Sequence, residues 1–139
     1  MYEYAISEVI KVVDGDTIEV VFDVGFSMFC KQRVRLDGID TPESITSDAN
    51  EKKYGMEAKE FLKDWVSKQK KLRAKTTKDD KYGRILAQVY GDVNPSVSVN
   101  EELIRQGYAW GYDGGTKAKD FNQLLEQRKQ WSAAKSAGN

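Results

Sequence analysis

The chain has 139 residues, with 22 Lys and Arg against 22 Asp and Glu, so its formal net charge is zero. This length predicts one domain with a single modest core, and neutrality excludes a partner that is held by bulk charge alone. Histidine is absent and Cys30 is the single cysteine, which excludes an internal disulfide, most zinc enzymes and hydrolases with a histidine base.

The first part of the chain is predicted to form strands. Residues 9–13 and residues 17–22 are rich in β-branched and aromatic side chains, and Asp-Gly separates them. A hairpin then leads into a strand that ends at Leu36. Alternation in this strand places Val34 and Leu36 on the core face, so we expect Arg35 to point outward.

The first helix follows a polar loop at residues 44–50. Asp48 and Glu51 are spaced as a capping pair at its start. Its apolar residues recur at intervals of three and four, as expected for one buried helix face. These residues are Ala58, Phe61, Leu62, Trp65 and Val66.

Two further strands and two further helices complete the prediction. Residues 70–77 and residues 84–90 are strand candidates that would pair as a hairpin. A short helix capped by Ser98 ends at Gly107, and a last helix begins near Phe121 and runs to about Trp131. The residues from about 133 are expected to be frayed.

Five strands, with helices after the third and the fifth, indicate an α+β domain over residues 1–139. Among small barrels the OB-fold has five strands, and its strand-and-loop face often binds oligonucleotides. The N-terminus lacks a basic segment before an apolar core, and no apolar run approaches eighteen residues. We therefore expect a cytoplasmic protein that does not enter membranes, with a phage-encoded protein as one alternative.

Three polar motifs interrupt the strands. "VVDGDT" brings Asp14 and Asp16 together across a glycine, "DTPE" spans residues 40–43, and "DKYGR" ends at Arg84. Each one alone fits an ordinary turn or a charged hairpin connection. An EF-hand loop is excluded because Gly15 stands at the second position of the loop instead of the sixth. Arg35, upstream of "DTPE", adds the planar donor that phosphate recognition favours.

Taken together and in this order, the motifs "VVDGDT", "RLDGIDTPE", "EKKYGMEAKEF", "DKYGR" and "VNEELIRQGYA" resemble the staphylococcal nuclease family. The resemblance covers nearly the whole chain and implies an OB-fold five-stranded β-barrel with three α-helices. Two segments are longer than in the best-known member, the hairpin between Phe22 and Val34 and the "GDVNPSVS" turn.

The resemblance also implies roles for individual residues. Asp16 and Asp40 resemble the carboxylate ligands of the metal, and Thr41 the carbonyl ligand. Glu43 resembles the residue that either takes the proton of the attacking water or orients that water. Asp14 resembles a nearby acidic residue that shapes the site. Arg35 and Arg84 resemble the two arginines that clamp the phosphate, and Lys81 and Tyr82 match positions that contact a terminal phosphate.

The implied activity is hydrolysis of DNA and RNA with little sequence preference, leaving 3′-phosphate ends. Ca²⁺ is the implied metal; oxygen ligands without histidine suit Ca²⁺, and also Mg²⁺ or Mn²⁺, better than zinc. We expect a monomer that favours single-stranded or locally melted substrates. Tyr108, Trp110 and Tyr112 are candidates for stacking on bases, and we assign Tyr112 to substrate binding. The alternative is a non-catalytic module of the same family that binds nucleic acid or protein.

Overall fold

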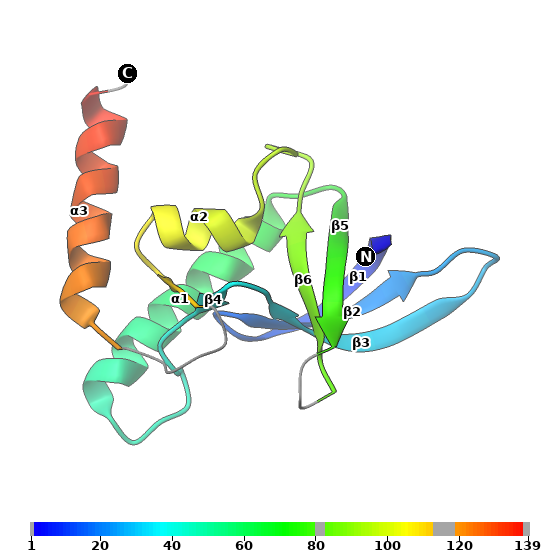
Figure 1. Ribbon diagram of the computed structural model, residues 1–139, viewed down its shortest axis with the longest axis horizontal. Coiled ribbons are helices and arrows are strands. Elements are labelled where there is room, and N and C mark those ends of the chain that lie inside the picture. The colour runs from blue at the N-terminus through cyan, green and yellow to red at the C-terminus, as the bar shows by residue number, and fades with distance from the viewer. Residues whose placement is uncertain (1, 80–82, 113–118, 138–139) are drawn as a thin grey trace.

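The computed structural model describes residues 2–79, 83–112 and 119–137. Figure 1 shows a small barrel with one helix across its base and another that extends away from it. No helix in the described ranges is both long and apolar enough to span a bilayer. The elements are β1 (Tyr2–Asp14), β2 (Thr17–Asp23), β3 (Phe29–Leu36), β4 (Ile39–Asp40), α1 (Ala49–Ser67), β5 (Leu72–Asp79), β6 (Ile85–Tyr90), α2 (Val99–Arg105), β7 (Trp110–Gly111) and α3 (Phe121–Ala137).

Five of the described strands close into a barrel in the order β1-β2-β3-β6-β5. The β3–β6 pair is parallel, and the other ordered neighbours are antiparallel. Val34 and Leu36 are buried as predicted, and Ile18, Val20 and Phe22 of β2 pack with them. On the predicted helix face Ala58 and Leu62 are buried, whereas Phe61, Trp65 and Val66 are half-buried. The predicted α+β fold, an OB-like five-stranded barrel with three helices, is confirmed for the described residues.

Three element boundaries differ from the prediction. β1 begins at Tyr2 because residues 2–6 pair with β5, a partner about seventy residues away that local alternation cannot reveal. β4 and β7 were not predicted, and they pair with each other over two residues each. α3 continues past Trp131 to Ala137, so residues 133–137 are helical where fraying was expected. That run contains no glycine or proline to end the helix.

Both predicted helix caps are present, but Glu51 has a different role. Asp48 accepts hydrogen bonds from the backbone N–H groups of Asn50 and Glu51, and Ser98 accepts one from Glu101. In a full capping box Glu51 would accept from the N–H of Asp48. That N–H donates instead to the hydroxyl of Thr46, and the Glu51 carboxylate points toward the loop before the helix.

Asn100 ties α2 to the end of the barrel where β3 finishes. Its side-chain oxygen accepts from Val89 N–H at 3.1 Å, and its amide nitrogen donates to the carbonyls of Asp37 and Ala87 at 2.9 and 3.0 Å. Because Asn100 is 2% exposed, these bonds are shielded from water. The turn that follows β3 is therefore held in a fixed place, and β4 starts directly after it.

Candidate active site

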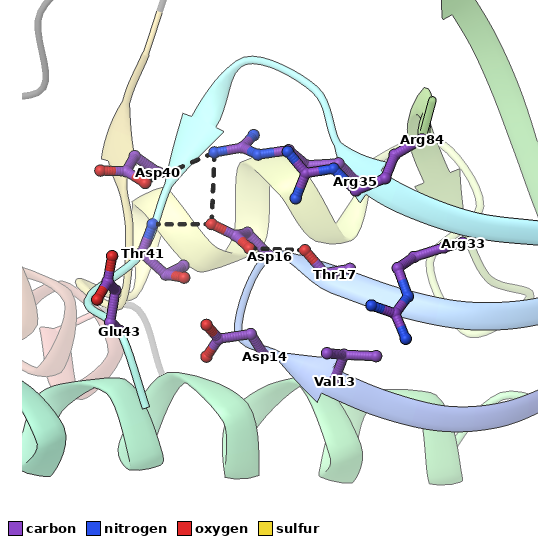
Figure 2. Close-up of a pocket in the computed structure, with 10 residues that line it drawn as sticks. All are labelled: Val13, Asp14, Asp16, Thr17, Arg33, Arg35, Asp40, Thr41, Glu43 and Arg84. Carbon is purple, nitrogen blue, oxygen red and sulfur yellow. Dashed lines mark hydrogen bonds and ion pairs between the residues drawn. The ribbon is translucent and has the colours of Figure 1, made fainter. Parts of the chain in front are cut away.

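A cavity of about 230 Å³ opens where β2 starts and β3 ends. Sheet register brings its residues together, because Thr17 lies opposite Arg35 and Val34 lies beside Ile85, the neighbour of Arg84. Figure 2 shows acidic side chains on one side of the cavity and Arg33 and Arg84 reaching in from the other. The carboxylates that line it are those of Asp14, Asp16, Asp40 and Glu43.

Arg35 is the most constrained cation of the cavity. Its Nη1 donates to the carbonyls of Leu36 and Ile39, at 3.2 and 3.0 Å. Its Nη2 lies 3.4 Å from Asp16 Oδ2 and 3.5 Å from Asp40 Oδ1. As predicted, Arg35 points away from the core, but at 8% exposed it is buried and not open to solvent. The rigid guanidinium thus presents one planar face to the cavity.

Asp16 is the hub of the hydrogen bonds drawn in Figure 2. One carboxylate oxygen accepts from the hydroxyl of Thr17 at 2.9 Å, and the other accepts from the backbone N–H of Thr41 at 3.4 Å as well as from Arg35. Burial raises the pKa of the neighbouring Asp14, and the charge of Asp16 adds to this effect, partly offset by the N–H of Gly15. Two carboxylates this close favour a cation between them.

Glu43 stands on a loop that α1 holds in place. Its backbone N–H donates to Glu51 Oε2 at 3.0 Å, and the same oxygen lies 2.7 Å from Lys119 Nζ. A Cβ on Gly55 would lie only 2.2 Å from the carbonyl oxygen of Glu43, so the loop packs directly on the helix backbone. Gly15 makes a similar close approach to Ala58. The Glu43 side chain itself is exposed at the cavity.

The donor set fits a hard cation. Asp16, in the turn before β2, and Asp40, in β4, approach the same positive group, and the ligands that they offer are oxygens. Among the described residues, no three carboxylate or cysteine side chains are placed so that they could hold a metal ion together, so further ligands would come from the main chain or water. Thr41 lines the cavity, and its buried hydroxyl has no hydrogen-bond partner among the described residues.

The three aromatic candidates occupy different environments. Tyr108 stacks on Phe61 at 4.7 Å between ring centroids, and Trp110 is 7% exposed and packs on Phe121. Tyr112 follows β7, which pairs with β4, and its ring centroid is 5.8 Å from Arg35 Cζ. Trp110 pairs with the cavity residue Asp40 through its main chain, whereas Tyr112 has its ring beside a side chain that lines the cavity. Lys81 and Tyr82 lie outside the described residues.

Three residues that the sequence did not single out belong to the site or support it. Arg33 lines the cavity, and Glu51 and Lys119 hold the backbone of Glu43. Arg33 shares the outward face of its strand with Arg35, which is a signal that the alternation carries. Glu51 was assigned to a capping pair, and nothing in the sequence pattern connects it with Lys119, 68 residues later.

The family model described as "Staphylococcal nuclease homologue" matches residues 33–138. "Uncharacterized protein MJ1439" of Methanocaldococcus jannaschii is 33% identical, covering 86% of this chain and 65% of its own length. The "Thermonuclease" of Staphylococcus hyicus is 37% identical, covering 73% of this chain and 56% of its own. "Endonuclease YncB" of Bacillus subtilis is 35% identical, covering 84% of this chain and 54% of its own length.

The match extends over most of the chain, which itself spans between half and two thirds of the length of these relatives. The motifs, the barrel with its helices and the cavity that gathers carboxylates with arginines agree with it. This chain belongs to the staphylococcal nuclease homologue family.

Proposed function

We propose that the protein is a Ca²⁺-dependent endonuclease that hydrolyses phosphodiester bonds of DNA and RNA with little sequence specificity and leaves 3′-phosphate ends. The observation that carries the proposal is the single cavity that holds Asp16, Arg35, Asp40, Glu43 and Arg84 together. Relatives named thermonuclease and endonuclease support this reaction class. Binding alone would not need carboxylates beside the two arginines, because carboxylates repel phosphate.

In this proposal Arg35 and Arg84 bind the scissile phosphate. Both line the cavity, and Arg35 is held by two carbonyls and two carboxylates, so it is oriented before the substrate arrives. Guanidinium groups donate charge-assisted hydrogen bonds that strengthen as negative charge accumulates on the phosphoryl oxygens. One such preorganised donor contributes about 3 to 4 kcal/mol to transition-state stabilisation.

Glu43 handles the attacking water. Its side chain reaches the cavity from the loop, while its backbone is fixed by Glu51 and by the packing on Gly55. A carboxylate in this place either removes the proton of the water or orients the water for attack. Substituting Gln would keep a hydrogen-bond acceptor and remove the base, so comparing Glu43→Gln with Glu43→Ala separates the two roles.

The metal would be held by Asp16, Asp40 and the main-chain carbonyl of Thr41. When bound, it would polarise a phosphoryl oxygen and lower the pKa of a water molecule. Mg²⁺ and Mn²⁺ also accept such ligands and are the weaker candidates. On the substrate side we assign base contact to Tyr112, next to Arg35, and terminal-phosphate contact to Lys81 and Tyr82. Base contact requires a single-stranded or locally melted substrate.

The test is cleavage of plasmid DNA and of single-stranded RNA in Ca²⁺, Mg²⁺ or EDTA, by the wild type and by Arg35→Ala, Glu43→Ala and Arg84→Ala. We expect cleavage in Ca²⁺, none in EDTA, and a loss of about 100-fold or more in each variant. Product ends are identified by their labelling before and after phosphatase treatment. A wild type that binds nucleic acid and never cleaves it would replace the enzyme by the alternative, a non-catalytic binding module.

A further inference from the structure

The outer face of β3 carries a row of side chains that begins in the cavity. Arg35 and Arg33 line the cavity, and Lys31 and Phe29 follow at alternate positions of the strand. The pairing of β2 with β3 is continuous over this length, so these side chains stay on one face. Lys31 and Arg33 both reach Glu19 of β2, at 3.3 and 3.2 Å, which places them side by side.

The most solvent-exposed charged side chains in the middle of this face are cationic. The side chains of Lys31 and Arg33 are 66% and 47% exposed, whereas that of Glu19 is only 14% exposed and lies beneath them. β3 itself contains no acidic residue. Asp23, across from Phe29, is exposed, and its carboxylate accepts the N–H of Gly25 at 2.9 Å, so one negative charge lies at the far end of the row. Lys31 and Arg33 carry two positive charges against the single carboxylate of Glu19, which leaves the middle of the row available to an anionic partner.

Exposed aromatic side chains stand at the end of this row. Phe29 is 61% exposed, and Phe26, at the tip of the hairpin, is 97% exposed. The tip residues Gly25, Phe26 and Ser27 have φ angles of 87°, 56° and 60°. Positive φ is unusual for a bulky residue. It holds Phe26 in solvent, where the ring buries almost no surface of its own. In Figure 1 this hairpin projects beyond the body of the barrel.

We propose that the outer face of β3 from Arg33 to Phe29, together with Phe26, binds the flanking segment of a single-stranded nucleic acid whose scissile phosphate sits in the cavity. Lys31 and Arg33 contact phosphates, and the two rings stack on bases. Basic side chains interleaved with exposed aromatic rings suit single strands, because a duplex hides the faces of its bases. The row extends about 20 Å from Arg35. This inference rests on the proposed function, which supplies the single-stranded substrate.

Two variants and two matched controls test the inference. Phe29→Ser and Lys31→Gln alter the proposed face. Val93→Ser replaces another exposed apolar residue, which is 68% exposed, and Lys63→Gln replaces another ion-paired lysine, whose side chain is 49% exposed. Each protein is assayed in Ca²⁺ for KM and kcat on a single-stranded trinucleotide and on a single strand of about 20 nucleotides, which is longer than one barrel contacts.

We expect both β3 variants to raise KM for the long strand about fivefold or more and to leave the trinucleotide within twofold of wild type. Lys31→Gln should also lower the slope of log affinity against log salt by about 0.7. Binding of the same long strand in EDTA, measured by fluorescence anisotropy, separates the two proposals. If the wild type binds the strand without cleaving it and the β3 variants bind it more weakly, the proposed nuclease activity is rejected and this face is kept as a binding surface.

Three outcomes would overturn the inference. The first is a wild type that does not bind single strands. The second is β3 variants that match the controls in KM and in affinity. The third is that the β3 variants differ from wild type only in molar mass in solution, measured by light scattering. That result would assign the aromatic tip to contact between copies of the chain.

Discussion

The two halves of the cavity are held by different kinds of contact. In the strand half, Arg35 lies in β3, Asp40 in β4 and Asp16 in the turn just before β2, where its carbonyl accepts the N–H of Leu36 at 2.8 Å. Buried ion pairs at 3.4 and 3.5 Å join the three residues. The loop half, Thr41 and Glu43, has no strand ladder. It is held by single hydrogen bonds to Asp16 and Glu51 and by packing on α1.

Because of this difference, substitutions in the two halves should affect stability and activity differently. Contacts in the strand half are shared with the barrel, so changing them disturbs the fold and the site together. Contacts in the loop half concern a segment whose functional side chain, Glu43, is exposed. The loop can therefore move or lose its side chain while the barrel remains folded. If the comparison is right, substitutions in the two halves should sort into these two classes.

The largest expected effect on stability is that of Arg35→Ala. Removing the guanidinium takes away the positive charge that lies 3.4 and 3.5 Å from the buried carboxylates of Asp16 and Asp40, which should cost about 3 to 5 kcal/mol in the free energy of unfolding. Glu43→Ala should cost less than about 1 kcal/mol, because the side chain is exposed. Urea denaturation in EDTA measures both. Arg33→Ala, whose ion pair is at the surface, is the control and should cost at most about 1 kcal/mol. Equal losses for Arg35→Ala and Glu43→Ala would contradict the division into halves.

Gly55→Ala should lower activity more than any other change outside the cavity. The new Cβ would meet the carbonyl carbon and oxygen of Glu43 within 2.3 Å, so the loop must shift. A displacement of about 1 Å of a catalytic group reduces kcat on the order of 100-fold, and overpacking costs about 1 to 3 kcal/mol. Gly111→Ala is the control, because nothing lies within 4 Å of its added Cβ. An unchanged kcat in Gly55→Ala would show that α1 does not position Glu43.

The strand half is also the part that the sequence predicts. Period-two alternation puts Val34 and Leu36 in the core and Arg35 outside it, and the structure agrees. Alternation says nothing of what covers the outer face, and β4 with its partner β7 is too short to leave a pattern. For this reason the sequence predicted the outward direction of Arg35 but not its burial, which leaves it 8% exposed.

The sequence motif identifies the residues of the loop half, but it does not reveal the contacts that hold the loop in place. A hydrogen bond from the backbone of Glu43 to Glu51, and from there to Lys119, joins three segments far apart in the chain. Such contacts depend on how α1 docks against the barrel, which no local periodicity records. The same reason explains β1, whose first residues form a strand only because β5 is beside them.

Glu51→Gln should lower kcat about tenfold by loosening the backbone of Glu43. Although burial opposes ionisation of Glu51, Lys119 and the Glu43 N–H lower its pKa below 4.5. A lowered pKa stabilises the folded state above pH 4.5, and that stability is lost as the pH falls through the folded-state pKa. The difference in Tm between wild type and Glu51→Gln should therefore shrink below pH 4.5. A difference independent of pH would show that the charge of Glu51 is not what holds the loop. Glu57→Gln, which affects another ion pair of α1, is the control for kcat.

The smallest effect should come from Thr41→Val, which tests whether Thr41 acts through its main chain. Its buried hydroxyl has no hydrogen-bond partner in the part of the chain that the structure describes, so replacing it with a methyl group should leave stability unchanged or raise it by up to about 1 kcal/mol. Thr17→Val is the matched control, because that hydroxyl donates to Asp16 at 2.9 Å and its loss should cost about 1.5 to 3 kcal/mol. Cleavage by Thr41→Val should stay within a few-fold of wild type, since the carbonyl and the N–H bonded to Asp16 are retained. A large loss of cleavage with unchanged Tm would mean that the hydroxyl itself contacts the substrate or a ligand of the site, and the loop half would then contain one more functional side chain than Glu43.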